Sequence, residues 1–141
     1  MKVLICESRP NVGQFLKLAI SLNYCVKKIH KVVGGTPAIV CMVHEGPFDI
    51  FYLNVREMDI KKNYIDIANS FLRSNPKGKI VFLYEDFEQN ERIVSEIEGG
   101  FNSQNYDLLK VPLDFFADID GLISSIKSEH VFDYIDESRK K

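Results

Sequence analysis

The sequence predicts an α/β fold, in which a doubly wound parallel sheet carries helices on both faces. Strand-like and helix-like segments alternate five times along the chain, and the connections between strands are too long for hairpins. The strand-like segments at residues 50–53 and 80–84 are apolar without alternation, which is typical of strands covered on both faces. A parallel sheet between two layers of helices accounts for these observations.

The first half of the chain predicts two strand–helix pairs. An apolar run at residues 2–6 precedes a helix cap at Ser8 and a proline, and apolar side chains then recur at helical spacing over residues 12–20. A basic, β-branched segment at residues 25–33 predicts the second strand. A threonine followed by proline predicts that the second helix occupies residues 36–46.

The second half continues the same alternation. Each strand-like run is followed by apolar residues at spacings of three and four. The predicted elements are a strand at residues 50–53, a helix over 60–74, a strand over 80–84, an acidic helix over 85–98, a strand from 108 that Pro112 ends, and a helix over 115–126.

The composition fits one globular domain. The chain has 141 residues, 45% of them hydrophobic and 27% charged, with a formal net charge of -2. It has no basic stripe of the kind that meets nucleic-acid phosphates, and no apolar run approaches the roughly 18 residues of a membrane span. We therefore expect a cytoplasmic domain without nucleic-acid or membrane partners, whose cysteines (Cys6, Cys25 and Cys41) are reduced and buried.

Asn54 is the candidate centre of a functional site. It follows the buried-type run at residues 50–53, and in parallel sheets the ligand-binding and reactive groups gather just beyond the carboxyl ends of the strands. Asp49 starts the same strand at the wrong end of the sheet and Asp59 lies further along the loop, so we interpret both as structural or solvated. Cys41 and His44 have a spacing that is weak support for a metal site.

Several segments share a pattern with a known family. They are residues 2–5 (KVLI), 45–50 (EGPFDI) and 79–83 (KIVFL), together with Lys110 and Pro112 at the end of the fifth strand. Over almost its whole length the chain resembles the receiver domain of bacterial two-component response regulators. The resemblance implies a flavodoxin-like five-stranded parallel sheet of strand order 2-1-3-4-5. Residues 1–128 would form this receiver-like domain, and residues 129–141 a C-terminal extension or linker stub.

The positions that carry the family's chemistry differ in this chain. In the family, two acidic residues after strand 1 hold Mg²⁺, an aspartate ending strand 3 is phosphorylated, and a threonine or serine ends strand 4. The acidic pair falls on Glu7 and Ser8, so that a divalent ion would lose an oxygen ligand. The phosphoacceptor falls on Asn54, whose amide cannot form an acyl phosphate. The small hydroxyl falls on Tyr84, which is too bulky for that role.

The family's final motif, a lysine followed directly by proline, has two alignments here. The chain reads Lys110-Val111-Pro112, so either Lys110 keeps the place beside the site or Val111 occupies it. The departures together imply a degenerate receiver, or pseudo-receiver, without catalytic residues, metal or cofactor. Its remnant phosphorylation site would comprise Glu7, Ser8, Asn54, Tyr84 and Lys110.

A pseudo-receiver implies a non-enzymatic role in signal transduction through protein–protein interaction. The family uses the face of helix 4, strand 5 and helix 5 for dimers and partners, and a covalently linked output domain is a further expectation. The acidic helix over 85–98 would favour a basic partner, although a solvated acidic face explains the same charges. The alternatives are a domain that senses a small ligand or anion in the remnant cleft, and an atypical receiver that still responds to phosphorylation.

Overall fold

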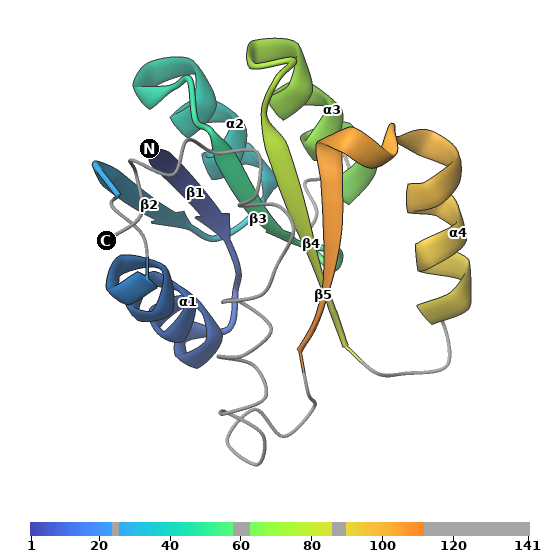
Figure 1. The fold of residues 1–141 in the computed structure, drawn as a ribbon, viewed down its shortest axis with the longest axis horizontal. Coiled ribbons are helices and arrows are strands. Elements are labelled where there is room, and N and C mark those ends of the chain that lie inside the picture. Colours follow the sequence, from blue (N-terminus) through green and yellow to red (C-terminus); the bar gives the residue numbers. More distant parts are fainter. Residues whose placement is uncertain (24–25, 58–62, 86–89, 112–141) are drawn as a thin grey trace.

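Five strands and four helices alternate along the described part of the chain (Figure 1). The computed structural model describes residues 1–23, 26–57, 63–85 and 90–111. The strands are β1 (Lys2–Cys6), β2 (Lys28–Val32), β3 (Ile50–Asn54), β4 (Lys79–Glu85) and β5 (Tyr106–Val111). The helices are α1 (Pro10–Asn23), α2 (Gly35–Glu45), α3 (Tyr64–Ser74) and α4 (Asn90–Gly100), and a 3₁₀ turn, η1 (Ser103–Asn105), precedes β5.

The strands form one parallel sheet in the order β2-β1-β3-β4-β5. This confirms the predicted flavodoxin-like topology. The chain winds outward from β1 to β2 on one side and from β3 to β5 on the other, so the winding direction reverses between β1 and β3. Ligand sites of open parallel sheets lie at this reversal, beyond the carboxyl ends of the strands. The fold therefore directs attention to the residues that follow β1 and end β3.

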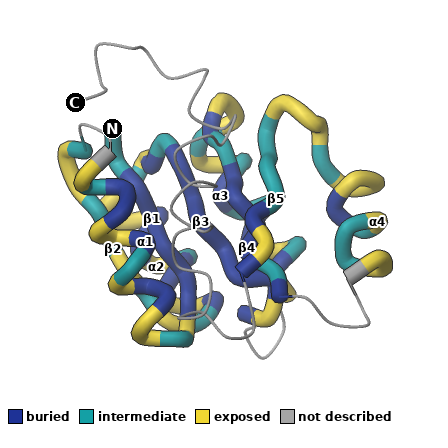
Figure 2. The backbone as a smooth tube through the Cα atoms, turned by 60° about the horizontal axis from the view of Figure 1, so that its bottom comes forward, coloured by how far each residue is buried: buried dark blue, intermediate teal, exposed yellow. Residues whose placement is uncertain are grey.

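Successive residues of the central strands enter two different hydrophobic cores, because neighbouring side chains of a strand point to opposite faces. One face is covered by α1 and the other by α2 and α3, and α4 lies beside β5 (Figure 1). The α1 core includes Ile5, Leu16, Tyr52, Leu83 and Val111. The opposite core includes Leu4, Leu53, Phe71, Phe82 and Ile97. Figure 2 shows the central strands buried, whereas exposed residues lie mainly on helices and turns.

Some element boundaries differ from the sequence prediction. Of the acidic helix predicted over 85–98, the described part is α4 from Asn90, and Glu85 is instead the buried last residue of β4. A glutamate after an apolar run looks like the start of a solvated segment, but here a long-range ion pair keeps it in the sheet. The last strand begins at Tyr106, ahead of the predicted start at residue 108.

Gly34 is the N-cap residue of α2, which begins at Gly35, one residue ahead of the predicted start at Thr36. The backbone of Gly34 has a φ of 91°, in the left-handed region where a side chain is strained. This conformation turns the chain from β2 into the helix and leaves the Gly34 N–H available to a side chain from the β3–α3 loop.

Other predictions fall on parts of the chain outside the described residues. These are the last helix over 115–126, Pro112, Cys25, Asp59 and the domain boundary at residue 128. Within the described ranges, the longest helix is α1 with 14 residues, and none combines the length and apolar character needed to cross a membrane.

Candidate functional site

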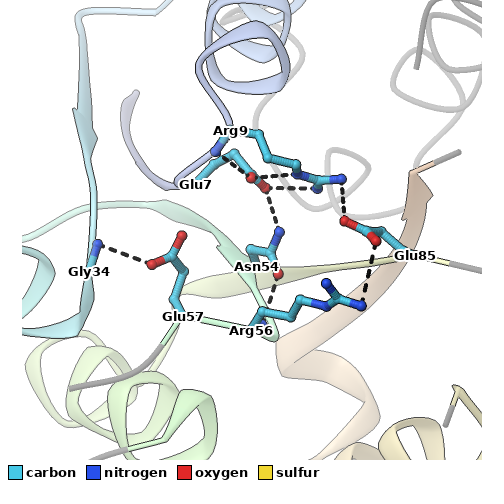
Figure 3. Close-up of polar contacts among 7 residues, drawn as sticks. All are labelled: Glu7, Arg9, Gly34, Asn54, Arg56, Glu57 and Glu85. Atoms are coloured by element: carbon cyan, nitrogen blue, oxygen red, sulfur yellow. Dashed lines mark hydrogen bonds and ion pairs between the residues drawn. The ribbon is translucent and has the colours of Figure 1, made fainter. Parts of the chain in front are cut away.

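Glu7, Asn54 and Glu85 lie together at the carboxyl edge of the sheet (Figure 3). Glu7 follows β1, Asn54 ends β3 and Glu85 ends β4. Each lies two positions beyond a side chain of the α1 core, so strand alternation places all three on the same face. All three are buried. Polar groups at such depth must find partners within the protein.

Arg9, in the loop between β1 and α1, joins the two carboxylates. Its Nε and Nη2 donate to Oε1 and Oε2 of Glu7 at 2.7 and 3.0 Å, and its Nη1 donates to Oε1 of Glu85 at 2.6 Å. The backbone N–H of Arg9 donates to Oε1 of Glu7 at 2.9 Å. The planar guanidinium thus binds one carboxylate in a bidentate manner and a second with its remaining edge.

Both the nitrogen and the oxygen of the Asn54 side-chain amide form hydrogen bonds. Nδ2 donates to Oε2 of Glu7 at 2.7 Å, and Oδ1 accepts from the backbone N–H of Arg56 at 2.8 Å. This orientation is the one that chemistry permits, because a carboxylate only accepts and a backbone N–H only donates. A carboxylate in place of the amide would set two negative charges against each other at this contact.

Glu57 lies beside this cluster, on the turn after β3. Its Oε2 accepts from the backbone N–H of Gly34 at 3.1 Å, and its backbone N–H donates to the Asn54 carbonyl at 3.0 Å. Its Oε1 is buried and has no hydrogen-bond partner among the described residues. The nearby Cys6 thiol donates to the Gly34 carbonyl at 3.4 Å. Burial, followed by the charge of Glu57, raises the pKa of Cys6 to about 12.

Three glutamates face two arginines here, so one negative charge is in excess (Figure 3). Arg56 contributes a weaker pair, with Nη2 3.7 Å from Oε2 of Glu85 and a side chain that is 59% exposed. Burial alone would lower the pKa of Arg9, but the hydrogen bond and charge of Glu7, with the charges of Glu85 and Glu57, raise the pKa above its ordinary value. Arg9 is therefore a permanent cation at the centre of the cluster.

The structure brings together only part of the predicted remnant site. Glu7 and Asn54 are in direct contact, whereas Ser8 is exposed and is not part of the hydrogen-bonded cluster described above. Tyr84 and Lys110 are paired neighbours on β4 and β5 and belong to the opposite face of the sheet. With Glu91, Val94 and Ser95 of α4 they line an open hollow of about 480 Å³.

The register of β5 shows whether Lys110 or Val111 lies on the face of the sheet that carries Asn54. Val111 pairs with Glu85 and is fully buried in the α1 core. Lys110 pairs with Tyr84 and is exposed. On the face that carries Asn54, β5 therefore contributes an apolar side chain in place of a lysine.

Sequence reasoning missed Arg9, Arg56, Glu57 and Glu85. For Glu85 a signal was present, because Leu83 belongs to the α1 core and a residue two positions later returns to the same face. For Arg9 the signal was a cation two residues after Glu7, the acidic residue that follows β1. Nothing in the sequence shows that these two residues meet, since they are 76 positions apart.

Several solved structures with this architecture are response-regulator proteins, and another is an adenylate cyclase from Rhodopirellula baltica, with a TM-score of 0.61 at 12% identity. A receiver protein from Sinorhizobium medicae has a TM-score of 0.63 at 12% identity, over 92% of this chain and 95% of that one. The phosphorylated cyanobacterial phytochrome response regulator RcpA has a TM-score of 0.65 at 12% identity, over 93% and 91%. The chain has the receiver-domain fold.

Receiver folds also occur within longer chains. NtrX from Brucella abortus matches 94% of this chain but only 29% of its own length, with a TM-score of 0.62 at 13% identity. No model of a known protein family matches the chain, and no curated protein matches it either. At these identities the likeness shows the fold alone.

The residues present do not fit the Mg²⁺ ion of a phosphorylatable receiver domain. Both oxygens of Glu7 already accept hydrogen bonds from Arg9 and Asn54, and Glu85 is engaged by Arg9. Ser8 is exposed, and Asn54 Oδ1 accepts from a backbone N–H. Among the described residues, no group of three or more acidic, cysteine or histidine side chains is arranged to hold a metal ion. A hard divalent cation needs several free oxygen ligands.

Proposed function

We propose that this chain is a pseudo-receiver that is not phosphorylated at Asn54 and acts in two-component signal transduction through protein contact. The observation that carries the proposal is the amide of Asn54, which sits at the carboxyl end of β3 with both ends hydrogen-bonded. An amide oxygen is not the ionised nucleophile that an acyl phosphate requires. The receiver-domain fold of the solved structures supports the signalling role.

The first experiment exposes the protein to a small-molecule phosphodonor with Mg²⁺ and measures its intact mass. The mass should stay unchanged, while a receiver domain with an aspartate acceptor in the same mixture gains a phosphoryl group. A stoichiometric, hydroxylamine-sensitive phosphoryl adduct on this chain would overturn the proposal and favour an atypical receiver that still responds to phosphorylation.

The contact surface that we propose is the face formed by α4 and β5, together with the predicted fifth helix outside the described residues. On α4 the exposed acidic side chains are Glu91 and Glu98. Glu96 is engaged by Tyr64 and Arg92. The described part of α4 is thus less acidic than the sequence predicts, because Glu85 belongs to β4. Two exposed carboxylates still favour a basic partner.

Self-association through this face can be tested by sedimentation. If the partner is a second copy of the chain, the sedimentation coefficient rises with concentration, and Glu91→Lys combined with Glu98→Lys changes that rise. Gln14→Lys, an exposed substitution on α1, serves as the control and should leave it unchanged. A monomer at every concentration would exclude self-association and leave a different protein as the partner.

A second candidate function is the sensing of a small ligand, and the hollow beside α4 favours it. The hollow joins an aromatic side chain, Tyr84, to Lys110 and Glu91, and sites of this kind combine apolar walls with a few polar groups. A screen of small anions by ligand-observed NMR tests it. Binding that Tyr84→Ala weakens supports sensing, and no binding at millimolar concentrations excludes it for those ligands.

A further inference from the structure

We propose that Arg9 is the resident cation of this site: its guanidinium fills the electrostatic place of a divalent ion and prevents one from binding. This inference rests on the proposed function. It names Arg9 as the group that keeps the cluster around Asn54 in one charge state. The cation would then be part of the chain, and the charge state of the cluster would not depend on any metal concentration.

The contacts of Arg9 support this role. A metal ion in such a cluster would draw together carboxylates from different strands, and Arg9 does the same with Glu7 after β1 and Glu85 on β4. The two strands are not neighbours, because β3 lies between them. The side chain of Glu7 is fully buried and that of Glu85 is only 11% exposed, so neither carboxylate can rely on water for its charge.

Competition between Arg9 and a metal follows from the shared oxygens. Each guanidinium N–H occupies a lone pair that a cation would need, and a guanidinium keeps its charge throughout the pH range in which proteins fold. A divalent ion could enter only by displacing a cation of fixed charge from the same carboxylates. Because the arginine is tethered within the loop before α1, its effective concentration at the site is high.

Removal of Arg9 should create a cation site. Without the guanidinium, Glu7 and Glu85 lose their main partner, and the buried Oε1 of Glu57 already has no hydrogen-bond partner among the described residues. Glu57 lies beside the cluster, where its backbone N–H donates to the Asn54 carbonyl at 3.0 Å. Glu7 and Glu85 would then supply two carboxylates, and a hard divalent cation that keeps several of its waters is commonly bound by one or two carboxylates.

The test is a Mn²⁺ titration of the whole chain, followed by thermal unfolding and calorimetry. The wild type should show no Mn²⁺-dependent change in Tm, and Arg9→Met should gain one of roughly 3 to 6 °C at about ten times the Kd. Arg9→Lys keeps the charge and should stay close to the wild type. Arg92→Met, which removes an exposed arginine from α4, is the matched control and should gain nothing. Equal stabilisation of all four proteins, or none in Arg9→Met, overturns the inference.

If Arg9→Met does not fold, a second measurement on the wild type tests whether a metal ion displaces Arg9. In NMR spectra, the Arg9 Nε–H and Asn54 side-chain signals should persist in millimolar Mg²⁺ and should not broaden with sub-millimolar Mn²⁺. Selective broadening or loss of these signals would show that a metal displaces Arg9. Displacement of Arg9 by a metal, with no phosphoryl adduct in the mass experiment, would contradict the role inferred for Arg9 but would not contradict the proposed function. An adduct on Asn54 or another residue would instead sink the proposed function.

Discussion

Nη1 of Arg9 lies 2.6 Å from Oε1 of Glu85, which connects two residues 76 positions apart in the chain. The contact spans β3, because Arg9 follows β1 and Glu85 ends β4. Asn54, at the end of β3, bonds to the same Glu7 that Arg9 holds. The carboxyl ends of three strands are therefore joined by one polar cluster.

Arg9→Met should lower the free energy of unfolding by about 2 to 3 kcal/mol at pH 7, because it leaves the buried carboxylate of Glu7 without its cation. The expected loss of unfolding free energy is smaller than for a fully buried ion pair, because the Arg9 side chain is 29% exposed to solvent. Urea unfolding monitored by circular dichroism measures the change. Arg92→Met should alter the same quantity by less than about 0.5 kcal/mol, since Arg92 is 76% exposed.

A double-mutant cycle with Arg9→Met and Glu85→Gln isolates the long-range pair. We expect a coupling free energy of about 1 kcal/mol, because the two side chains are in direct contact and mostly buried. Additive single and double variants would mean that the contact contributes nothing measurable to stability.

Asn54→Asp should destabilise the fold by about 1 to 3 kcal/mol at pH 7, because it replaces an amide donor with a second carboxylate at the 2.7 Å contact with Glu7. Such a neighbour raises the pKa of the carboxylate pair in the folded state. The loss of unfolding free energy is therefore largest above that raised pKa and becomes smaller as the pH falls through it. Urea unfolding at pH 7 and at pH 4.5, each against the wild type, follows this difference.

Asn63→Asp is the matched control for that substitution. Asn63 is exposed and caps α3, and aspartate is an equally good cap. Its effect should stay within about 0.5 kcal/mol at pH 7. If Asn54→Asp were as mild as this control, the amide of Asn54 would not be essential to the cluster.

The Cys6 thiol should resist alkylation in the folded protein. Burial and the charge of Glu57 raise its pKa to about 12, so the reactive thiolate is scarce at pH 8. Iodoacetamide labelling followed by peptide mass spectrometry should modify Cys6 in urea but not in buffer. Rapid labelling of native Cys6 at pH 8 would instead indicate an accessible thiol suited to redox sensing.

The hydroxyl of Tyr64 on α3 donates to Oε2 of Glu96 on α4 at 2.7 Å. This hydrogen bond, followed by that from Arg92, holds the pKa of Glu96 below its ordinary value. Tyr64→Phe and Arg92→Met should therefore each raise the pKa of Glu96 toward its ordinary value, as measured by NMR titration of the carboxyl carbon. In the wild type, the stabilising contribution of Glu96 is full above its ordinary pKa and is lost as the pH falls through the lowered value.

The fold was largely predictable from periodicity and from the family resemblance. Unbroken apolar runs near residues 50 and 80 identify strands with two covered faces, and the strand order agrees with the structure. The end of β4 was misjudged, because a glutamate after such a run is usually solvated. Burial of Glu85 depends on Arg9, and a local pattern carries no information about a partner so distant in the chain.

The site was predictable at the level of single positions but not as a set. Alignment to a family motif selected Tyr84 and Lys110 by their order in the chain, whereas the pleat of the strands places them on the face opposite Asn54. Because alternate residues of a strand share a face, Glu85, two positions after Leu83, could have been selected instead. The positions of Glu7 and Asn54 were predicted, but not the arginine that binds Glu7.

The shared oxygens of Glu7 have an evolutionary consequence. A substitution that places an aspartate at position 54 sets it against the carboxylate of Glu7, which Arg9 holds in place. A substitution that first removes Arg9 leaves the buried charge of Glu7 without its cation. Either first step lowers stability, and only the combination makes room for a metal and a phosphoacceptor. Arg9 and Asn54 are thus expected to be strongly epistatic, so that single mutations in chains that carry both would rarely produce a phosphorylatable site.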